Sequence, residues 1–233
     1  MRFLNIDELE KNFETKEGNF NSLRDENAFP YLELKTGKIF FSNYIHHLNT
    51  ECFDRDEEEF QQLLTYKDIF QKRFYFSSYL FKIYTENPPI IVGGSALEYY
   101  SGAQYPTGAI DFYLEEDVLD KLIKFLRKKK FYKRGKYYYS LDKKIAVEPH
   151  SGHFNGDKKY LNKMIYGDKE VLLIGIEDLI VDRINIFDKK EYPEEYDWAH
   201  RLFKSYQNFI DVEYFKRKLK RDGLLSYLEK LKI

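Results

Sequence analysis

The sequence predicts an α+β fold in which a mixed sheet carries helices on one side. Between residues 88 and 190, short apolar runs typical of strands alternate with longer runs whose apolar residues recur at helical period. The strands run in mixed directions, and the remainder of the chain reads as helix, a pattern of α+β proteins. We expect three segments: a mostly helical N-terminal extension with a short hairpin (1–87), a core domain (88–190) and a C-terminal helical segment (191–233).

The expected elements follow from local patterns along the chain. Asp54 or Asp56 is a candidate cap for a long N-terminal helix. Asn87-Pro88-Pro89 ends that helix, because proline disfavours helical backbone in the residue before it. In chain order we expect a hairpin around Thr36-Gly37, a helix over 54–84, a strand at 90–92, a helix over 95–102, a strand at 110–114, a helix over 116–130, a hairpin of 136–141 with 143–148, a strand at 171–174, and helices over 176–187, 193–207, 212–221 and 224–232.

Composition excludes several classes of protein. The 38 basic and 39 acidic residues nearly cancel, so total charge gives no argument for a nucleic-acid or membrane partner. The single cysteine, Cys52, excludes an internal disulfide and a cysteine-rich zinc site, and it fits a reducing cytoplasm. The N-terminus has no apolar signal-peptide region, and no apolar run approaches the ~20 residues of a membrane span. We therefore expect a cytoplasmic protein without a membrane partner.

The most informative stretch is residues 91–114. A short apolar strand runs into Gly93-Gly94-Ser95 at the start of a helix, and Thr107-Gly108-Ala109-Ile110-Asp111 leads into a second strand. Glycines let the backbone approach a phosphate, and the amides of a helix start supply donors. Asp111 is placed to hold a divalent metal ion against that phosphate. Side chains two apart on a strand point the same way, so the second acid of such a site would stand at position 109, which is alanine.

The glycine turn followed by Thr-x-x-Ile-Asp resembles the signature of the DNA polymerase β-like nucleotidyltransferase superfamily. It is most similar to small prokaryotic nucleotidyltransferases of the toxin–antitoxin and abortive-infection type. Glu177-Asp178-Leu179-Ile180 at a helix start and Asp197-Trp198-Ala199 in the next helix support the resemblance, which covers residues 88–205. It implies transfer of a nucleoside monophosphate from a triphosphate such as ATP to a hydroxyl of a protein or tRNA, with two Mg²⁺ ions. It also implies a toxin or antitoxin partner.

The resemblance implies roles for the matching residues. Asp111 and a carboxylate on a neighbouring strand would hold Mg²⁺, and Glu148, which closes the apolar strand 145–147, is the best candidate. Glu148 would also orient or deprotonate the acceptor hydroxyl. The nucleotide phosphates would be bound by the amides of the turn and by nearby hydroxyls, from Gly93, Gly94, Ser95 and Thr107.

Ala109 leaves two explanations open. The protein is either a natural degenerate member that binds nucleotide or a partner without catalysis, or an active enzyme silenced by an engineered substitution. In both cases we expect little transferase activity, since metal stabilisation of charge is worth several kcal/mol. The alternative from another class is a non-catalytic, antitoxin-like module that uses the same fold to hold a partner.

Several other features favour structural roles. Glu177 and Asp178 fit helix N-terminal acids that complement the helix dipole better than they fit catalysts. His150 and His153 fit exposed loop residues, with a place in the nucleotide cleft as the alternative. The basic run over 127–136, interleaved with aromatic residues, fits a solvated helix end and hairpin; the alternative is a surface that contacts a triphosphate or RNA.

Overall fold

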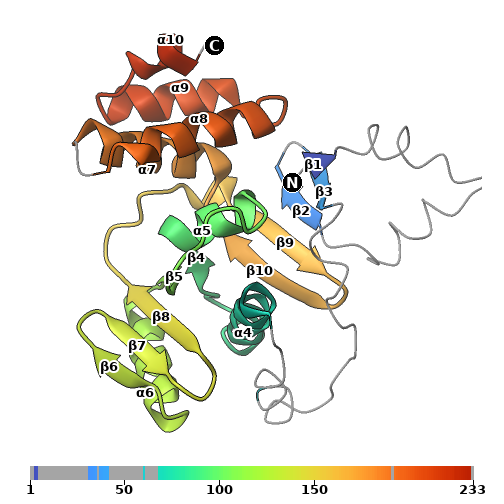
Figure 1. Cartoon of the computed structure of the whole chain (residues 1–233), viewed down its shortest axis with the longest axis vertical. Coiled ribbons are helices and arrows are strands. Elements are labelled where there is room, and N and C mark those ends of the chain that lie inside the picture. Colours follow the sequence, from blue (N-terminus) through green and yellow to red (C-terminus); the bar gives the residue numbers. More distant parts are fainter. Residues whose placement is uncertain are drawn as a thin grey trace, which may run out of the picture.

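The computed structural model describes residues 3–4, 31–35, 37–41, 60, 68–189 and 192–231 of the chain. Within these ranges the predicted α+β class is confirmed, with one mixed sheet and separate helices (Figure 1). The strands are β1 (Phe3–Leu4), β2 (Tyr31–Leu34), β3 (Gly37–Phe41), β4 (Ile90–Ile91), β5 (Ile110–Tyr113), β6 (Tyr132–Arg134), β7 (Tyr137–Ser140), β8 (Ile145–His150), β9 (Asn162–Tyr166) and β10 (Lys169–Leu173). Their order in the sheet is β1-β3-β2-β9-β10-β4-β5-β8-β7-β6.

The helices largely follow the periodic patterns of the sequence. Helix α4 (Ile69–Ile83) begins at Ile69, because the Asp68 side chain accepts a hydrogen bond from the Gln71 amide and caps the helix start. The expected caps, Asp54 and Asp56, lie outside the described residues. The helical elements are α4 (Ile69–Ile83), α5 (Gly93–Tyr100), α6 (Glu116–Lys128), the short η1 (Lys158–Tyr160), α7 (Ile176–Asp188), α8 (Glu194–Tyr206), α9 (Val212–Arg221) and α10 (Tyr227–Leu231).

The centre of the sheet mixes two strand directions. β4 pairs antiparallel with β5 and parallel with β10. β5 pairs parallel with β8, which requires a long connection, and α6 lies within that connection. In this register Asp111 is the direct partner of Glu148, so two predicted site residues lie side by side on neighbouring strands.

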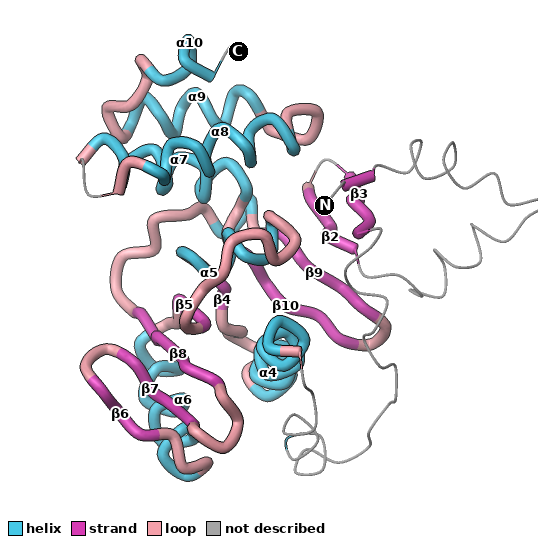
Figure 2. Tube along the Cα trace, in the orientation of Figure 1, coloured by secondary structure: helices cyan, strands magenta, loops and turns pink. Residues whose placement is uncertain are grey.

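Helix α4 is the main cover of the sheet. It packs against β10 and β8 (Figure 2), and every residue from Phe70 to Leu80 is buried. Ring contacts join α4 to α5 through Phe70 and Tyr99, with centroids 5.0 Å apart, and to α6 through Tyr79 and Phe125, with centroids 6.0 Å apart. These three helices therefore form a continuous apolar layer against the sheet.

Three strands, β1, β6 and β9, were not expected from the sequence. β6 and β9 each belong to a hairpin with a two-residue turn that begins with a glycine of positive φ, Gly135-Lys136 and Gly167-Asp168. Such turns match the twist of paired strands, and only glycine adopts their backbone without strain. The hairpin expected around Thr36-Gly37 is present as the antiparallel pair of β2 and β3.

Candidate functional site

A cleft of about 500 Å³ lies between the start of α5, strands β5 and β8, the β6–β7 turn and helices α7 and α8. Pockets of several hundred Å³ are of the size that holds small molecules. The cleft is polar and contains carboxylates, an imidazole and basic groups. Of the residues that the sequence singled out, those that line it are Gly93, Gly94, Thr107, Ala109, Asp111, Glu148 and His150.

Strand geometry brings three ligand atoms together in this cleft. Asp111 and Glu148 are partners across β5 and β8, and His150 lies two residues beyond Glu148 on the same face of β8. One ligand atom from each of these residues lies within 4.8 Å of the other two. Carboxylate oxygens and imidazole nitrogens are common metal ligands, so this donor set fits a divalent cation.

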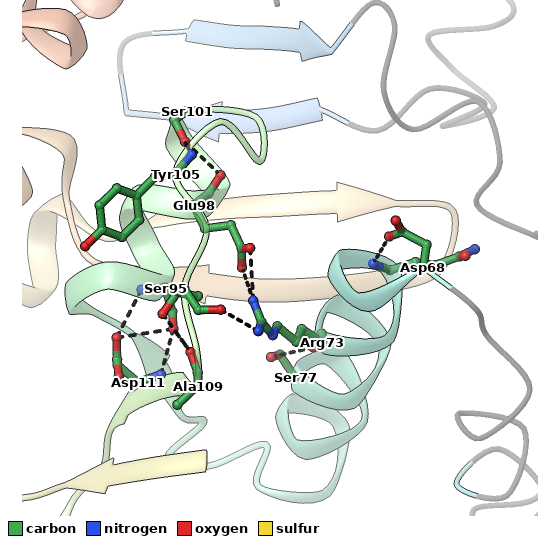
Figure 3. A network of polar contacts seen from close by, with 11 residues as sticks. Asp68, Arg73, Ser77, Ser95, Glu98, Ser101, Tyr105, Ala109 and Asp111 are labelled. Atoms are coloured by element: carbon green, nitrogen blue, oxygen red, sulfur yellow. Dashed lines mark hydrogen bonds and ion pairs between the residues drawn. The ribbon is translucent and has the colours of Figure 1, made fainter. Parts of the chain in front are cut away.

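Ser95 supports Asp111 and does not face the cleft. Its amide donates a 3.0 Å hydrogen bond to Asp111 Oδ2, its hydroxyl donates to the Ala109 carbonyl at 2.7 Å, and the Asp111 amide donates to the hydroxyl (Figure 3). The residue is 1% exposed. Both donor groups of Ser95 therefore have partners within the protein, and its role as a phosphate ligand stays a prediction.

Gly93 is needed for the close approach of the turn to Asp111. Gly93 has φ +58°, and a Cβ atom there would lie 3.1 Å from Asp111 Oδ2. At Gly94, a Cβ atom would lie 3.4 Å from Thr107 Oγ1 and 3.5 Å from Asp111 Oδ2. The amides of Gly93 and Gly94 lie in the first turn of α5, where helix geometry supplies no internal acceptor. These two amides are the donors that the turn offers to a ligand.

Burial changes the electrostatics of Asp111. Removal from water raises the pKa of its carboxyl group, the Ser95 amide hydrogen bond lowers it, and the neighbouring Glu148 carboxylate raises it again, with a net upward shift. Two nearby carboxylates repel one another in their charged forms. A cation between them would relieve this repulsion.

Glu148 has two cationic or polar neighbours at one oxygen atom. Lys136 Nζ lies 2.7 Å and His150 Nε2 lies 3.1 Å from Glu148 Oε1. The hydrogen bond to Glu148 raises the pKa of Lys136, whose side chain is 64% exposed. His150 is exposed, as expected, but it ends β8 instead of lying in a loop, and it lines the cleft, which was the alternative. Lys136 is the member of the basic run that reaches the cleft, because it lies in the β6–β7 turn.

Ala109 contributes no ligand to the site. Its methyl group stands where the second acid of the motif was expected, and its carbonyl accepts hydrogen bonds from the hydroxyls of Ser95 and Thr107. The residue is buried within the lining of the cleft. Among the described residues, the candidate metal-binding group therefore contains the acid at 111 without a companion at 109.

A buried arginine fixes the loop that leads into β5. Arg73 Nη1 of α4 donates to both carboxylate oxygens of Glu98 in α5, at 2.9 and 2.8 Å, and Nη2 donates to the Thr107 carbonyl at 2.5 Å (Figure 3). Burial raises the pKa of Glu98, and the guanidinium opposes that shift. Sequence reasoning missed Arg73, because a single arginine in an amphipathic helix gives no sign of its partners.

The acids at the start of α7 have structural roles, as the sequence indicates. Asp178 pairs with Lys218 Nζ at 2.7 Å and accepts hydrogen bonds from the Tyr214 hydroxyl and the Asp157 amide. Glu177 accepts a hydrogen bond from the Asp211 amide at 2.8 Å. Neither belongs to the metal-binding group, and both tie α7 to the segments around it.

Comparisons of the chain with protein-family models, with curated proteins and with solved structures give no match. Within the described residues, none of the helices has both the length and the apolar character needed to cross a bilayer. The function is therefore inferred from the residues of the cleft.

Proposed function

We propose that the protein is nucleotidyltransferase-like and binds a nucleoside triphosphate with a divalent cation in this cleft. The observation that carries the proposal is the in-register pair of Asp111 and Glu148, which lies beside the glycine start of α5 in a cleft of about 500 Å³. The glycine turn and Thr-x-x-Ile-Asp resemble those of the superfamily named above. An α+β fold with a mixed sheet is compatible with that family.

The glycine turn, Ser95, Asp111 and Glu148 each have a role in this proposal. The amides of Gly93 and Gly94 donate to phosphate oxygens, since a helix start favours anions. Asp111 and Glu148 hold the cation, which when bound neutralises phosphate charge. Ser95 keeps Asp111 oriented toward the turn. Glu148 is also placed to accept the proton of an acceptor hydroxyl, which attacks the α-phosphate and releases pyrophosphate.

The acceptor in this proposal is a hydroxyl of a protein side chain or of a tRNA end. The cation that the family resemblance implies is Mg²⁺. The pair Tyr137 and Tyr139 lines the same cleft, with ring centroids 5.8 Å apart. Tyrosine rings on the wall of a nucleotide site offer faces on which a base can stack. Both rings come from β7, next to the turn that carries Lys136.

One observation favours a second candidate, a non-catalytic module that binds a toxin or antitoxin partner. Ala109 supplies a methyl group at the position of the second acid, and two-metal chemistry needs ligands for both ions. If this second candidate is correct, the cleft has the shape of an enzyme site but lacks the full set of metal ligands. The protein would then act through its surface.

Calorimetry distinguishes the two candidates. We expect ATP, CTP, GTP or UTP, titrated with Mg²⁺ into the full chain, to bind with a dissociation constant near micromolar and to lose that binding in Asp111→Asn. No binding of any of the four at millimolar concentration would contradict the nucleotide proposal and favour the partner module. A transfer assay with labelled nucleotide on tRNA and on protein acceptors then identifies the acceptor.

A further inference from the structure

We propose that the metal site of this cleft binds a first-row transition-metal dication through His150 and selects it over Mg²⁺. The inference rests on the proposed function, because it names the class of cation for the same cleft. It goes beyond the family resemblance, which implies carboxylate ligands and Mg²⁺. The evidence is the position of one imidazole on β8.

The geometry of the three ligands fits a single ion. Ligands at ~2.0–2.2 Å from a shared metal ion lie about 3 Å from one another. His150 Nε2 and Glu148 Oε1 already lie 3.1 Å apart, and an oxygen of Asp111 completes a set whose members are all within 4.8 Å. All three residues come from two paired strands, which hold their backbones in fixed register.

The three ligands differ from those that the motif suggests. The motif expects an acid at position 109, whereas the structure offers an imidazole at position 150. Position 109, two residues before Asp111, carries a methyl group, and position 150, two residues after Glu148 at the end of β8, carries an imidazole. The site therefore loses an oxygen ligand at one end and gains a nitrogen ligand at the other. Mg²⁺ is bound mainly by oxygen and releases its water reluctantly, whereas imidazole suits the transition metals.

Lys136 affects any cation at this site equally. Its ammonium group lies 2.7 Å from the same Glu148 oxygen, so a metal ion must displace it to reach that oxygen. Because the side chain is largely exposed on a hairpin turn, it is free to move away at low cost. Removal of Lys136 should therefore raise the affinity for Mg²⁺ and for transition metals by the same factor. Removal of His150 should change their ratio.

The test uses Co²⁺ and Mg²⁺ as probes of the full chain, by calorimetry and by the visible absorption of bound Co²⁺. We expect His150→Asn to lower the affinity for Co²⁺ at least tenfold, to alter the Co²⁺ spectrum, and to leave the affinity for Mg²⁺ within twofold. His153→Asn is the matched control, because this imidazole lies outside the metal-binding group, and it should change neither affinity. Lys136→Gln should raise both affinities two- to fivefold.

Two results would overturn the inference. One is an unchanged Co²⁺ affinity and spectrum in His150→Asn; the other is an equal loss of Co²⁺ and Mg²⁺ affinity in that variant. Either result with nucleotide binding intact leaves the proposed function standing. A wild-type chain that binds neither nucleotide nor metal contradicts both. Since His150 lies at a strand end and is partly exposed, its replacement should not unfold the protein.

Discussion

Two pairs of acidic residues differ in how their charge is matched. Asp111 and Glu148 line the cleft, whereas Glu177 and Asp178 lie in the first turn of α7. Asp178 is matched by the Lys218 ammonium, whose side chain is 3% exposed. Both pairs are largely hidden from water, so burial alone does not identify a ligand-binding acid.

The two pairs differ in which groups donate hydrogen bonds to their carboxylates. Asp178 is bonded to groups held by α9 and by the loop before η1, which are fixed parts of the fold. Glu148 is bonded to Lys136 on an exposed turn and to His150 at a strand end, and the Lys136 side chain can move away from it. An acid whose partners can be exchanged is available to a ligand. Variants of Asp178 and Glu148 test this distinction directly, and variants of Ala109 and Asp211 have progressively smaller expected effects.

Asp178→Asn should destabilise the protein strongly. The change leaves the buried Lys218 ammonium without a counter-charge, and such a loss costs about 3–5 kcal/mol of unfolding free energy. Urea unfolding measures it. The matched control is Asp117→Asn, which removes an exposed pair with Lys121 and should cost less than about 0.5 kcal/mol. A loss below about 1 kcal/mol in Asp178→Asn would remove the contrast between the two pairs.

Glu148→Gln should change metal affinity strongly and stability little. Its lysine partner is exposed, so unfolding free energy should change by less than about 1 kcal/mol. Affinity for divalent metal should fall about 100-fold, because a ligand is lost. Calorimetry and urea unfolding measure the two quantities on one preparation. Glu170→Gln, which removes a carboxylate paired with Lys163 on the neighbouring hairpin, should leave metal affinity unchanged. Retained metal binding in Glu148→Gln would exclude this residue as a ligand.

Ala109→Asp should raise metal-dependent nucleotide transfer at least tenfold if position 109 lacks only a ligand. The new carboxylate would face the cleft on the same side of β5 as Asp111. A tenfold gain corresponds to about 1.4 kcal/mol of transition-state stabilisation. Ala109→Asn is the control of equal size without the charge, and its turnover should stay at the level of the parent. Equal rates for both variants would favour the non-catalytic module.

Asp211→Asn should give the smallest effect, a pH-dependent loss of unfolding free energy. The Tyr214 amide hydrogen bond lowers the pKa of this carboxyl, which caps α9. A lowered pKa contributes stability above the unfolded value near 3.9, which is lost as pH falls through the folded value. Asp211→Asn keeps a capping oxygen, so unfolding free energy should drop by about 0.3–1 kcal/mol at pH 6 and the difference should shrink below about pH 4. A pH-independent difference would contradict this assignment.

Much of the secondary structure could be predicted from the sequence, because its signals are local. The helix over 212–221 has the expected bounds, since Asp211 caps its start and Gly223 with positive φ follows its end. Strand β9 was missed because its lysine and asparagine weaken the apolar pattern. The Gly167-Asp168 turn was the signal that could have found it.

The site was predictable only in part, because its contacts depend on strand direction. The motif placed Gly93 and Asp111 near one another, and the structure does so too. The antiparallel pairing of β4 with β5 carries Asp111 next to Ser95, and no local pattern shows that pairing. No local pattern of the sequence shows the parallel register of β5 and β8 either, so the sequence analysis placed His150 in a loop. Its spacing of two from Glu148 was the available clue.

The contacts of Arg73 have a consequence for how the core could be studied in isolation. This guanidinium reaches across 34 positions of sequence to the Thr107 carbonyl, from a helix that precedes the expected boundary at residue 88. A recombinant fragment that starts at that boundary would leave the Glu98 carboxylate inside the protein without its cation. It would also uncover the apolar surface on which Phe74 and Leu80 rest. The shortest self-sufficient unit therefore includes α4, which belongs to the same packed body as the segment that starts at residue 88.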